Sequence, residues 1–263
     1  MDKMGQMPEI EREGEKISPR REAVISNTLR DKVVLITGAT GVLGSAVVGE
    51  FAQTEAQLAL TSRSPQKLKQ LAAEIGLTEE RVFTVVADVT QADQVEDLVA
   101  AVVAHFGRVD VLLNTVGGWS GGQSVGETSV EEWNRMLALN LHSAFLLSRA
   151  VLPPMLEAGW GRIVHVSSKT AVEPRAKVAG YAVSKMGVIT LTEVIAAEVK
   201  GTGVTANVIL PSIIDTPANR ASMPKADPSR WVPPERIAAT MRFLCSDAAA
   251  SINGARLPVY GAV

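Results

Sequence analysis

The chain has 263 residues, of which 46% are hydrophobic, and its formal net charge is −2. This length fits one large domain with a substantial core, and the balanced charge indicates neither a nucleic-acid surface nor a basic membrane patch, so we expect neither partner. The only cysteine, Cys245, excludes a disulfide framework and is typical of a reducing compartment; we expect a cytoplasmic protein in which Cys245 is a small buried side chain of a late helix.

The first 30 residues are rich in charge and lack the apolar run of a secretory signal, so we expect a flexible extension over 1–30 and one domain over 31–263. From Lys32 onward, short apolar runs alternate with longer amphipathic stretches. The runs predict strands at 33–37, 58–62, 82–87, 109–115, 162–167, 204–210 and 255–260. The stretches predict helices at 42–53, 64–75, 91–105, 131–155, 181–200 and 235–246.

Strands that are apolar on both faces and are separated by helices are typical of a parallel sheet covered on each side. We therefore predict an α/β fold, a single doubly wound Rossmann-like domain with a parallel sheet of about seven strands.

A glycine-rich turn joins the first strand to the first helix, in the sequence Thr37-Gly-Ala-Thr-Gly-Val-Leu-Gly44. Glycines let the backbone approach a pyrophosphate, and a helix N-terminus offers free N–H groups and the positive end of the helix dipole. After the first buried strand of a parallel sheet, this pattern predicts a dinucleotide site.

Tyr181 and Lys185 lie four residues apart, and Ser168 lies 13 residues before Tyr181. Four residues give about 6 Å of helical rise, so both side chains leave the same face. A phenol ionises at about pH 10, and a nearby ammonium favours the phenolate, so we expect Lys185 to lower the pKa of Tyr181. The three side chains could move a proton to or from a carbonyl oxygen.

These motifs together resemble the short-chain dehydrogenase/reductase family over about residues 31–261. The resemblance implies a catalytic set of Asn140, Ser168, Tyr181 and Lys185, with Tyr181 as the acid or base of a hydride transfer between nicotinamide and a carbonyl or alcohol carbon. In that set Ser168 would bind the substrate oxygen, Lys185 the nicotinamide ribose, and Asn140 a water of a proton relay. The implied cofactor contacts are Gly38, Thr40, Gly41, Val42, Leu43, Gly44, Ser62, Arg63, Asp88, Val89, Asn114, Val116, Gly117, Tyr181, Lys185, Pro211, Ile214 and Thr216.

Three positions depart from the family pattern. Val42 stands where the middle glycine is usual, with Gly41 one residue earlier, and this spacing also resembles extended family members. Thr115 replaces the second asparagine of Asn-Asn-Ala-Gly, and Ser212 replaces the glycine after Pro211. The last two are small polar residues that we expect to be tolerated.

The end of the second predicted strand reads Thr61-Ser-Arg-Ser64, with no acidic residue to bind the ribose hydroxyls. Arg63 could make a charge-assisted contact with a 2′-phosphate. We therefore expect NADP(H) as the cofactor, with NAD(H) as the alternative. Because the chain has one cysteine and scattered histidines, we expect no metal site, and we expect His165 to be a hydrogen-bonded core residue.

The substrate is predicted only as a small carbonyl or alcohol compound. The segment Leu210–Asp227 resembles the corresponding loop of dihydropteridine reductases, so a dihydropteridine-reductase-like or quinone-reducing enzyme is one alternative. A second is a sensor or scaffold that binds NADP(H) without turnover. A sugar-nucleotide epimerase is disfavoured, because it needs a larger domain than the short segment after Pro211. The family resemblance also implies a homo-oligomer, a tetramer or a dimer.

Overall fold

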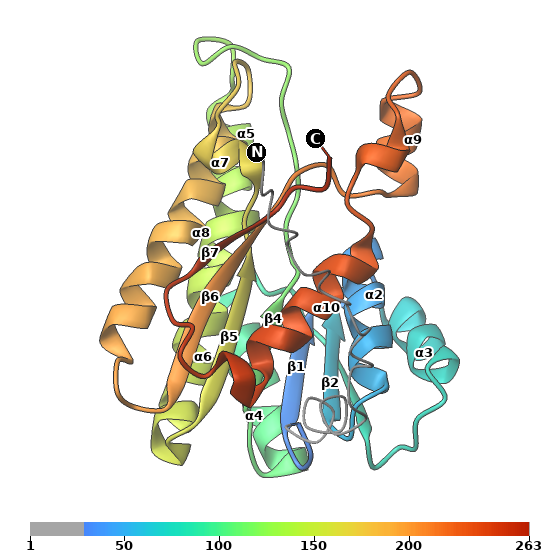
Figure 1. The fold of residues 1–263 in the computed structure, drawn as a ribbon, viewed down its shortest axis with the longest axis vertical. Helices are drawn as coiled ribbons and strands as arrows, with labels where there is room; N and C mark the ends of the chain where they lie inside the picture. The colour runs from blue at the N-terminus through green and yellow to red at the C-terminus, as the bar shows by residue number, and fades with distance from the viewer. Residues whose placement is uncertain (1–28, 263) are drawn as a thin grey trace, which may run out of the picture.

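The computed structural model describes residues 29–262, which contain one sheet of seven strands in the order β3-β2-β1-β4-β5-β6-β7 (Figure 1). Every neighbouring pair of strands is parallel. The strands are β1 Val33–Thr37, β2 Gln57–Ser62, β3 Val82–Val86, β4 Val111–Asn114, β5 Gly161–Val166, β6 Val204–Pro211 and β7 Arg256–Val259. The predicted α/β fold is confirmed, and each predicted strand is present with ends that differ by one or two residues at most.

Helices cover both faces of this sheet. One layer packs against the face that carries Val34 and Ile36, and its members are α2 (Val42–Ala52), α3 (Pro65–Glu74) and α10 (Pro234–Cys245). The other layer packs against the face that carries Val33 and Leu35, and its members are α4 (Ala92–Phe106), α6 (Ser143–Ala158) and α8 (Ala179–Glu198). Successive strand residues therefore serve opposite cores, which explains why the strands are apolar on both faces.

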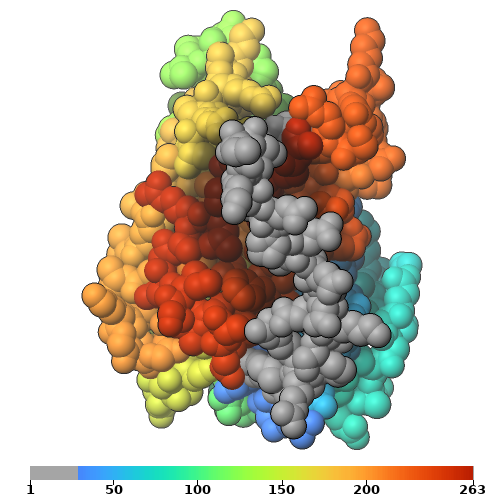
Figure 2. All heavy atoms as spheres, in the orientation of Figure 1, coloured from blue at the N-terminus to red at the C-terminus, as the bar shows by residue number. Residues whose placement is uncertain are grey.

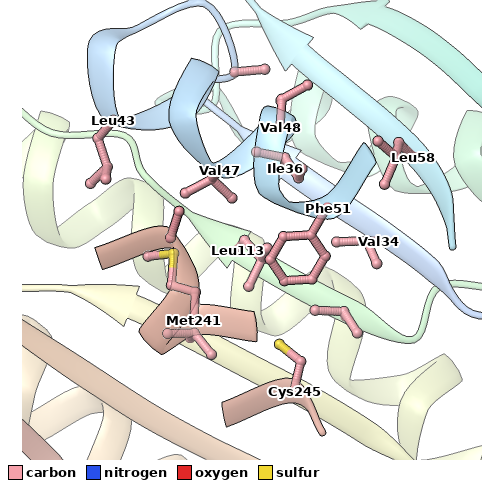
Figure 3. Close-up of a cluster of buried hydrophobic side chains, with 14 of the residues drawn as sticks. Val34, Ile36, Leu43, Val47, Val48, Phe51, Leu58, Leu113, Met241 and Cys245 are labelled. Carbon is pink, nitrogen blue, oxygen red and sulfur yellow. The ribbon is translucent and has the colours of Figure 1, made fainter. Parts of the chain in front are cut away.

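Phe51 is the one aromatic residue among the buried residues of the core beneath α2 within residues 29–262. Phe51 is fully buried and lies among side chains from β1, β4 and α10, including Leu113, Met241 and Cys245 (Figure 3). Cys245 is buried and unpaired in α10, as predicted. A fully buried aromatic or aliphatic side chain stabilises a fold by about 1.5–3 kcal/mol relative to its exposed state.

The long helix predicted over 131–155 is interrupted. It consists of α5 (Val130–Leu137), a five-residue π-helical segment η1 (Ala138–His142), and α6. By length and composition, the stretch Val130–Ala158 could cross a membrane; 44% of its most apolar window is buried inside the protein, and core helices pass the same test. In this fold α5 packs on α8, and α6 packs on the sheet.

Two short helices lie between the predicted elements. Ser168 caps α7 (Lys169–Val172) and Thr216 caps α9 (Pro217–Ser222), each by accepting a hydrogen bond from a backbone N–H two or three residues later. Such single-turn helices rest on capping and have too few residues to show a hydrophobic period. A 3-10 turn, η2 (Pro228–Arg230), follows α9, and η3 (Asp247–Ala249) follows α10.

The predicted N-terminal extension over 1–30 lies almost entirely outside the described residues. Its last two residues belong to the folded part: Leu29 is 1% exposed within the core, and Arg30 donates to Glu55 at 3.0 Å. The folded domain therefore includes two residues before the predicted boundary at residue 31.

Candidate active site

The residues that the sequence singled out gather at the carboxyl ends of the strands, the edge where parallel sheets bind ligands. This edge is flanked by the loop 117–129 with α7 on one side and by the α9 segment on the other. Both stand out as prominences at the same end of the molecule (Figure 2, green and yellow at upper left, orange at upper right). The site is built between these elements.

The glycine-rich turn brings the end of β1 against the start of α2. Gly38 has a φ of +68°, and a Cβ at Gly44 would lie 2.1 Å from the carbonyl oxygen of Gly38. No side chain fits between the turn and the helix, so both positions need glycine. The helix begins after Gly41 without a side-chain cap, and both Gly41 and Val42 are exposed. The N–H groups of this helix end are available to an anion, with Thr40 half-buried and Leu43 buried beside them.

Tyr181, Lys185 and Ser168 lie together, as predicted. Tyr181 is in the first turn of α8. Its phenol forms a hydrogen bond with Ser168, which lies two residues after the end of β5. Lys185 is 4% exposed, and its ammonium donates to the Val166 carbonyl at 2.8 Å. A half-buried phenol, a buried hydroxyl and a buried ammonium therefore lie near the junction of β5 and α7.

The pKa values of this group correct one expectation. Burial raises the pKa of Tyr181, and the hydrogen bond from Ser168 opposes the rise without reversing it. Burial also lowers the pKa of Lys185, to about 8. The prediction that Lys185 lowers the pKa of Tyr181 is therefore wrong for the chain by itself, because desolvation dominates at both residues.

Asn140 lies in the π-helical segment η1 and is 1% exposed. Its amide oxygen accepts from the Gly118 N–H at 2.9 Å, and its amide nitrogen donates to the Gly118 carbonyl at 3.1 Å and to the Ser184 hydroxyl at 3.0 Å. One extra residue per turn lets η1 turn Asn140 toward the loop after β4, and π-helical turns are frequent at functional sites. Asn140 thus ties that loop to α8.

Gly117 lies between Asn140 and Lys185. A Cβ at this position would be 2.9 Å from the Lys185 ammonium and 3.0 Å from the Asn140 amide oxygen. Only glycine leaves the loop this close to both side chains. The absence of a side chain at Gly117 therefore lets Asn140 and Lys185, which are 45 positions apart in the sequence, both lie close to the backbone of this loop.

Asn114 at the end of β4 holds the start of the same loop. Its amide oxygen accepts from the Thr37 hydroxyl at 2.9 Å and from the Val116 N–H at 3.1 Å. His165 on β5 is fully buried beside it, with ring nitrogens 3.3 Å from the Asn114 amide nitrogen and 2.9 Å from the Ser148 hydroxyl. His165 is therefore a hydrogen-bonded core residue, as predicted.

The expected adenosine contacts lie at the ends of β2 and β3. Ser62 is half-buried and is bonded locally to Ser64, whereas Arg63 is exposed and has no side-chain partner within residues 29–262. Asp88 accepts from Thr90, and Val89 is buried beneath it. Arg63 is thus free to meet a ligand.

The segment after β6 carries the other expected contacts. Pro211 ends the strand, Ile214 pairs with Val232, and Thr216 caps α9. The α9 segment is fastened to this base by the paired carboxylate and guanidinium of Asp215 and Arg220, whose Nε–Oδ1 distance is 2.6 Å. A projecting helix fastened at its base is a suitable cover for a substrate.

The sequence did not indicate three partners of the predicted catalytic residues: Ser184, Gly118 and the carbonyl of Val166. Ser184 stands beside Lys185 in the motif and could have been suspected from that position. The other two act through backbone atoms, which leave no trace in residue type. A small cavity of about 20 Å³ also reaches Tyr181 between Ser120 and Lys177, which is room for about one water. Within the described part of the chain, no three or more His, Cys, Asp or Glu residues could hold a metal ion.

Comparison with known proteins gives consistent results. The family model described as short chain dehydrogenase matches residues 32–227. D-threitol dehydrogenase of Mycolicibacterium smegmatis is 36% identical over 242 residues, which cover 89% of this chain and 93% of the relative. D-beta-hydroxybutyrate dehydrogenase of Rhizobium meliloti is 29% identical over 252 residues, covering 88% and 97%. The crystal structure of gox2181 superposes with a TM-score of 0.85 at 27% identity, covering 91% and 97% of the two chains.

Proposed function

Because the chain belongs to the short-chain dehydrogenase family and is an oxidoreductase acting on CH–OH or C=O groups, we propose that it reduces a small carbonyl compound with NADP(H), or oxidises the corresponding alcohol, with Tyr181 as the acid or base. One observation carries this proposal. The half-buried phenol of Tyr181 is hydrogen-bonded to the buried Ser168, one helical turn from the buried ammonium of Lys185.

Tyr181 suits the role of acid in the direction of reduction. Its raised pKa keeps the phenol protonated at neutral pH, so a proton is available for the oxygen that gains charge. Ser168 can donate to the same oxygen, because its hydroxyl already meets the phenol. In the direction of oxidation Tyr181 must first lose its proton, so oxidation is expected to become faster as the pH rises.

Lys185 and Asn140 supply the route by which that proton is replaced. The pKa of Lys185, about 8, lets the ammonium give up a proton near neutral pH. Gly117 lies against both side chains, and Asn140 is already bonded to Gly118 and Ser184. We assign Lys185 to the nicotinamide ribose as well, and Asn140 to a water that leads to solvent.

The dinucleotide fits the carboxyl-terminal edge of the sheet. The uncapped start of α2 and the glycines at 38, 41 and 44 would hold its pyrophosphate, and the loop 116–118 would line its nicotinamide end. When bound, it supplies or accepts the hydride. Arg63 has no side-chain partner in the described part of the chain and no acidic residue beside it in the sequence, which supports NADP(H) over NAD(H).

The substrate is proposed to be a small hydroxylated compound or its ketone. Both relatives named above carry such a compound in their names, threitol and hydroxybutyrate. A panel of polyols, hydroxy acids and their ketones, with a quinone and a quinonoid dihydropterin added, separates this proposal from the quinone- and dihydropteridine-reducing alternatives. Turnover of the last two alone would overturn it.

The decisive experiment is Tyr181→Phe. We expect turnover to fall by about 10²–10⁴-fold while cofactor affinity stays within about twofold, because only the proton-transfer group is removed. The chain has two tyrosines, so Tyr260→Phe is a matched control and should retain activity. Steady-state kinetics and a fluorescence titration with NADPH measure the two effects. Full activity in Tyr181→Phe would refute the assignment.

We also propose a cytoplasmic homo-oligomer, a tetramer or dimer. The support is a set of exposed apolar side chains on α6 and α8, namely Phe145, Leu156, Val183, Met186 and Val194. Exposed apolar residues gathered on neighbouring helices favour contact with another protein surface. Light scattering after size-exclusion chromatography decides the number of subunits.

A further inference from the structure

A buried chain of hydrogen bonds runs from α6 to the loop after β4, and His165 is at its centre. At one end the Ser148 hydroxyl donates to the Ala144 carbonyl at 2.7 Å. At the other end the Val116 N–H donates to Asn114 Oδ1 at 3.1 Å. His165 lies between, with Nε2 2.9 Å from the Ser148 oxygen and Nδ1 3.3 Å from the Asn114 amide nitrogen.

The donor and the acceptor are fixed in the hydrogen bonds at both ends of this network. A carbonyl can only accept, so Ser148 uses its proton on Ala144 and its oxygen must accept from His165 Nε2–H. A backbone N–H can only donate, so Val116 requires Asn114 to present its oxygen. The amide nitrogen of Asn114 then faces His165 and needs an acceptor there. The neutral ring protonated at Nε2 is the form that satisfies both neighbours.

The orientation of the Asn114 amide affects the candidate site through the loop 116–118, which we call the cofactor loop. Asn114 holds its first residue by the Val116 N–H, and Asn140 holds its last by the Gly118 N–H and carbonyl. Gly117 between them lies against the Lys185 ammonium. If the Asn114 amide turned over, its NH₂ group would face the Val116 N–H and the loop would lose one of its two anchors.

We propose that His165 is a positioning residue for cofactor binding: as an acceptor at Nδ1 it fixes the Asn114 amide, and thereby holds the cofactor loop against Lys185. This inference rests on the proposed function, because it assumes that the loop contacts a nicotinamide dinucleotide. Burial and the nearby Lys185 charge lower the pKa of His165 to about 4, which keeps the ring neutral.

Two substitutions test the roles of the two ring nitrogens of His165 separately. The amide oxygen of His165→Asn takes the place of Nδ1 and can still accept from Asn114. The amide of His165→Gln reaches the place of Nε2 and can donate to Ser148, but leaves Asn114 without an acceptor. We expect both variants to lose similar stability, whereas the Kd for NADPH rises about tenfold in His165→Gln and stays within about twofold of the wild type in His165→Asn.

The affinities are measured by fluorescence titration of the full chain, and stability by thermal unfolding. The control Thr192→Val removes a buried hydroxyl that donates to the carbonyl four residues earlier, as Ser148 does, but outside this network, and should leave Kd unchanged. Equal Kd values for the Asn and Gln variants, or values that follow stability alone, would overturn the proposal.

A second measurement needs no cofactor. The chain has three histidines, so ¹⁵N imidazole spectra are readily assigned with His105→Asn and His142→Asn. We expect His165 as the neutral Nε2–H form from pH 8 to about pH 5. An Nδ1–H ring, or an imidazolium at pH 6, would overturn the inference. A wild-type chain that binds NADPH without oxidising or reducing any alcohol or ketone would refute the proposed function and leave these comparisons valid; one with no affinity for either dinucleotide would refute both.

Discussion

Arg63 stands alone at the end of β2, exposed and without a side-chain partner among residues 29–262. A guanidinium in this position could bind a 2′-phosphate through two charge-assisted hydrogen bonds, which NADH does not offer. We therefore expect Arg63→Ala to raise the KM for NADPH about tenfold and to leave the KM for NADH unchanged.

Steady-state kinetics with each cofactor test this expectation. Lys67→Ala removes another exposed cation nearby on α3 and is the matched control. An equal change of both KM values in Arg63→Ala, or a wild-type enzyme that uses NADH at least tenfold better, would contradict the assignment.

The buried His165 predicts how the stability of the fold changes with pH. Its pKa is about 4 in the folded chain, against 6.5 for a free imidazole, so the unfolded chain binds more protons between these values. The free energy of unfolding therefore falls as the pH drops from 6.5 to 4, by up to about 3 kcal/mol from this residue. His165→Asn should be less stable at pH 7 and should lose part of this slope.

Urea unfolding at intervals of pH measures the effect, and the exposed His105 provides the control His105→Asn. Identical slopes for wild type and His165→Asn would show that the buried ring is not the source. Carboxylates titrate in the same range, so the difference between the two chains is the informative quantity.

The residue types of the candidate site were predictable because each had a chemical reason to be there. Tyr181, Lys185 and Ser168 were recognised from spacing, and the structure brings them together. The hydrogen-bond partners of these side chains were not predictable. The Asn140 side chain bonds to the backbone of Gly118, and the Lys185 ammonium donates to the backbone carbonyl of Val166. The raised pKa of Tyr181 was missed because desolvation depends on the surrounding fold, whereas spacing shows only the nearest charge.

At the level of elements, the turn before α2 depends on contact between backbone atoms. A Cβ at Gly44 would lie 2.1 Å from the Gly38 carbonyl oxygen, whereas a Cβ at Gly49 in the same helix would meet nothing within 4 Å. We expect Gly44→Ala to cost about 3 kcal/mol and to abolish cofactor binding, because the helix must move away from the turn.

Gly49→Ala is the matched control and should be neutral or more stable by up to about 1 kcal/mol, since alanine favours the helix. Thermal unfolding and NADPH titration measure both variants. Normal cofactor affinity in Gly44→Ala would show that the turn does not shape the pyrophosphate site.

The elements themselves were well predicted where a hydrophobic period runs for several turns. The main helices were predicted from such stretches and the seven strands from short apolar runs, and their ends differ little from the prediction. The π-helical segment Ala138–His142 was missed, because one extra residue in a turn changes the hydrogen-bond ladder without changing the apolar pattern. That segment carries Asn140, so the feature least visible in the pattern is one that shapes the site.

At the scale of the whole molecule, the carboxyl and amino ends of the strands differ in the residues that they carry. The carboxyl ends carry the glycine-rich turn, a buried ammonium and the candidate site. The amino ends carry a charged cluster: Lys32 and Arg162 both lie over the Trp160 ring, and Lys32 is also 3.7 Å from the buried Asp110 carboxylate. Among residues 29–262, no hydrogen bond or ion pair joins this cluster to Asn140, Ser168, Tyr181 or Lys185, so we expect that stability and activity can be altered separately.

Asp110 tests that separation. Its carboxylate is 1% exposed, accepts from the Val33 N–H at 2.9 Å, and meets the Arg108 guanidinium at 2.7 Å. Asp110→Ala leaves the buried N–H at the start of β1 without an acceptor and removes the ion pair, so we expect a loss of about 2–4 kcal/mol. Asp110→Asn can still accept from Val33 and should lose less.

Urea unfolding measures the loss, and kcat/KM at a temperature where both variants stay folded should remain within about twofold of the wild type. A fall in kcat/KM without a fall in stability would contradict the separation of the two edges. So would Asp110→Ala with wild-type stability, because the first strand would then need no anchor at its amino end. The expected pattern, lost stability with intact catalysis, is the reverse of that expected for Tyr181→Phe, which alters a hydroxyl at the opposite edge.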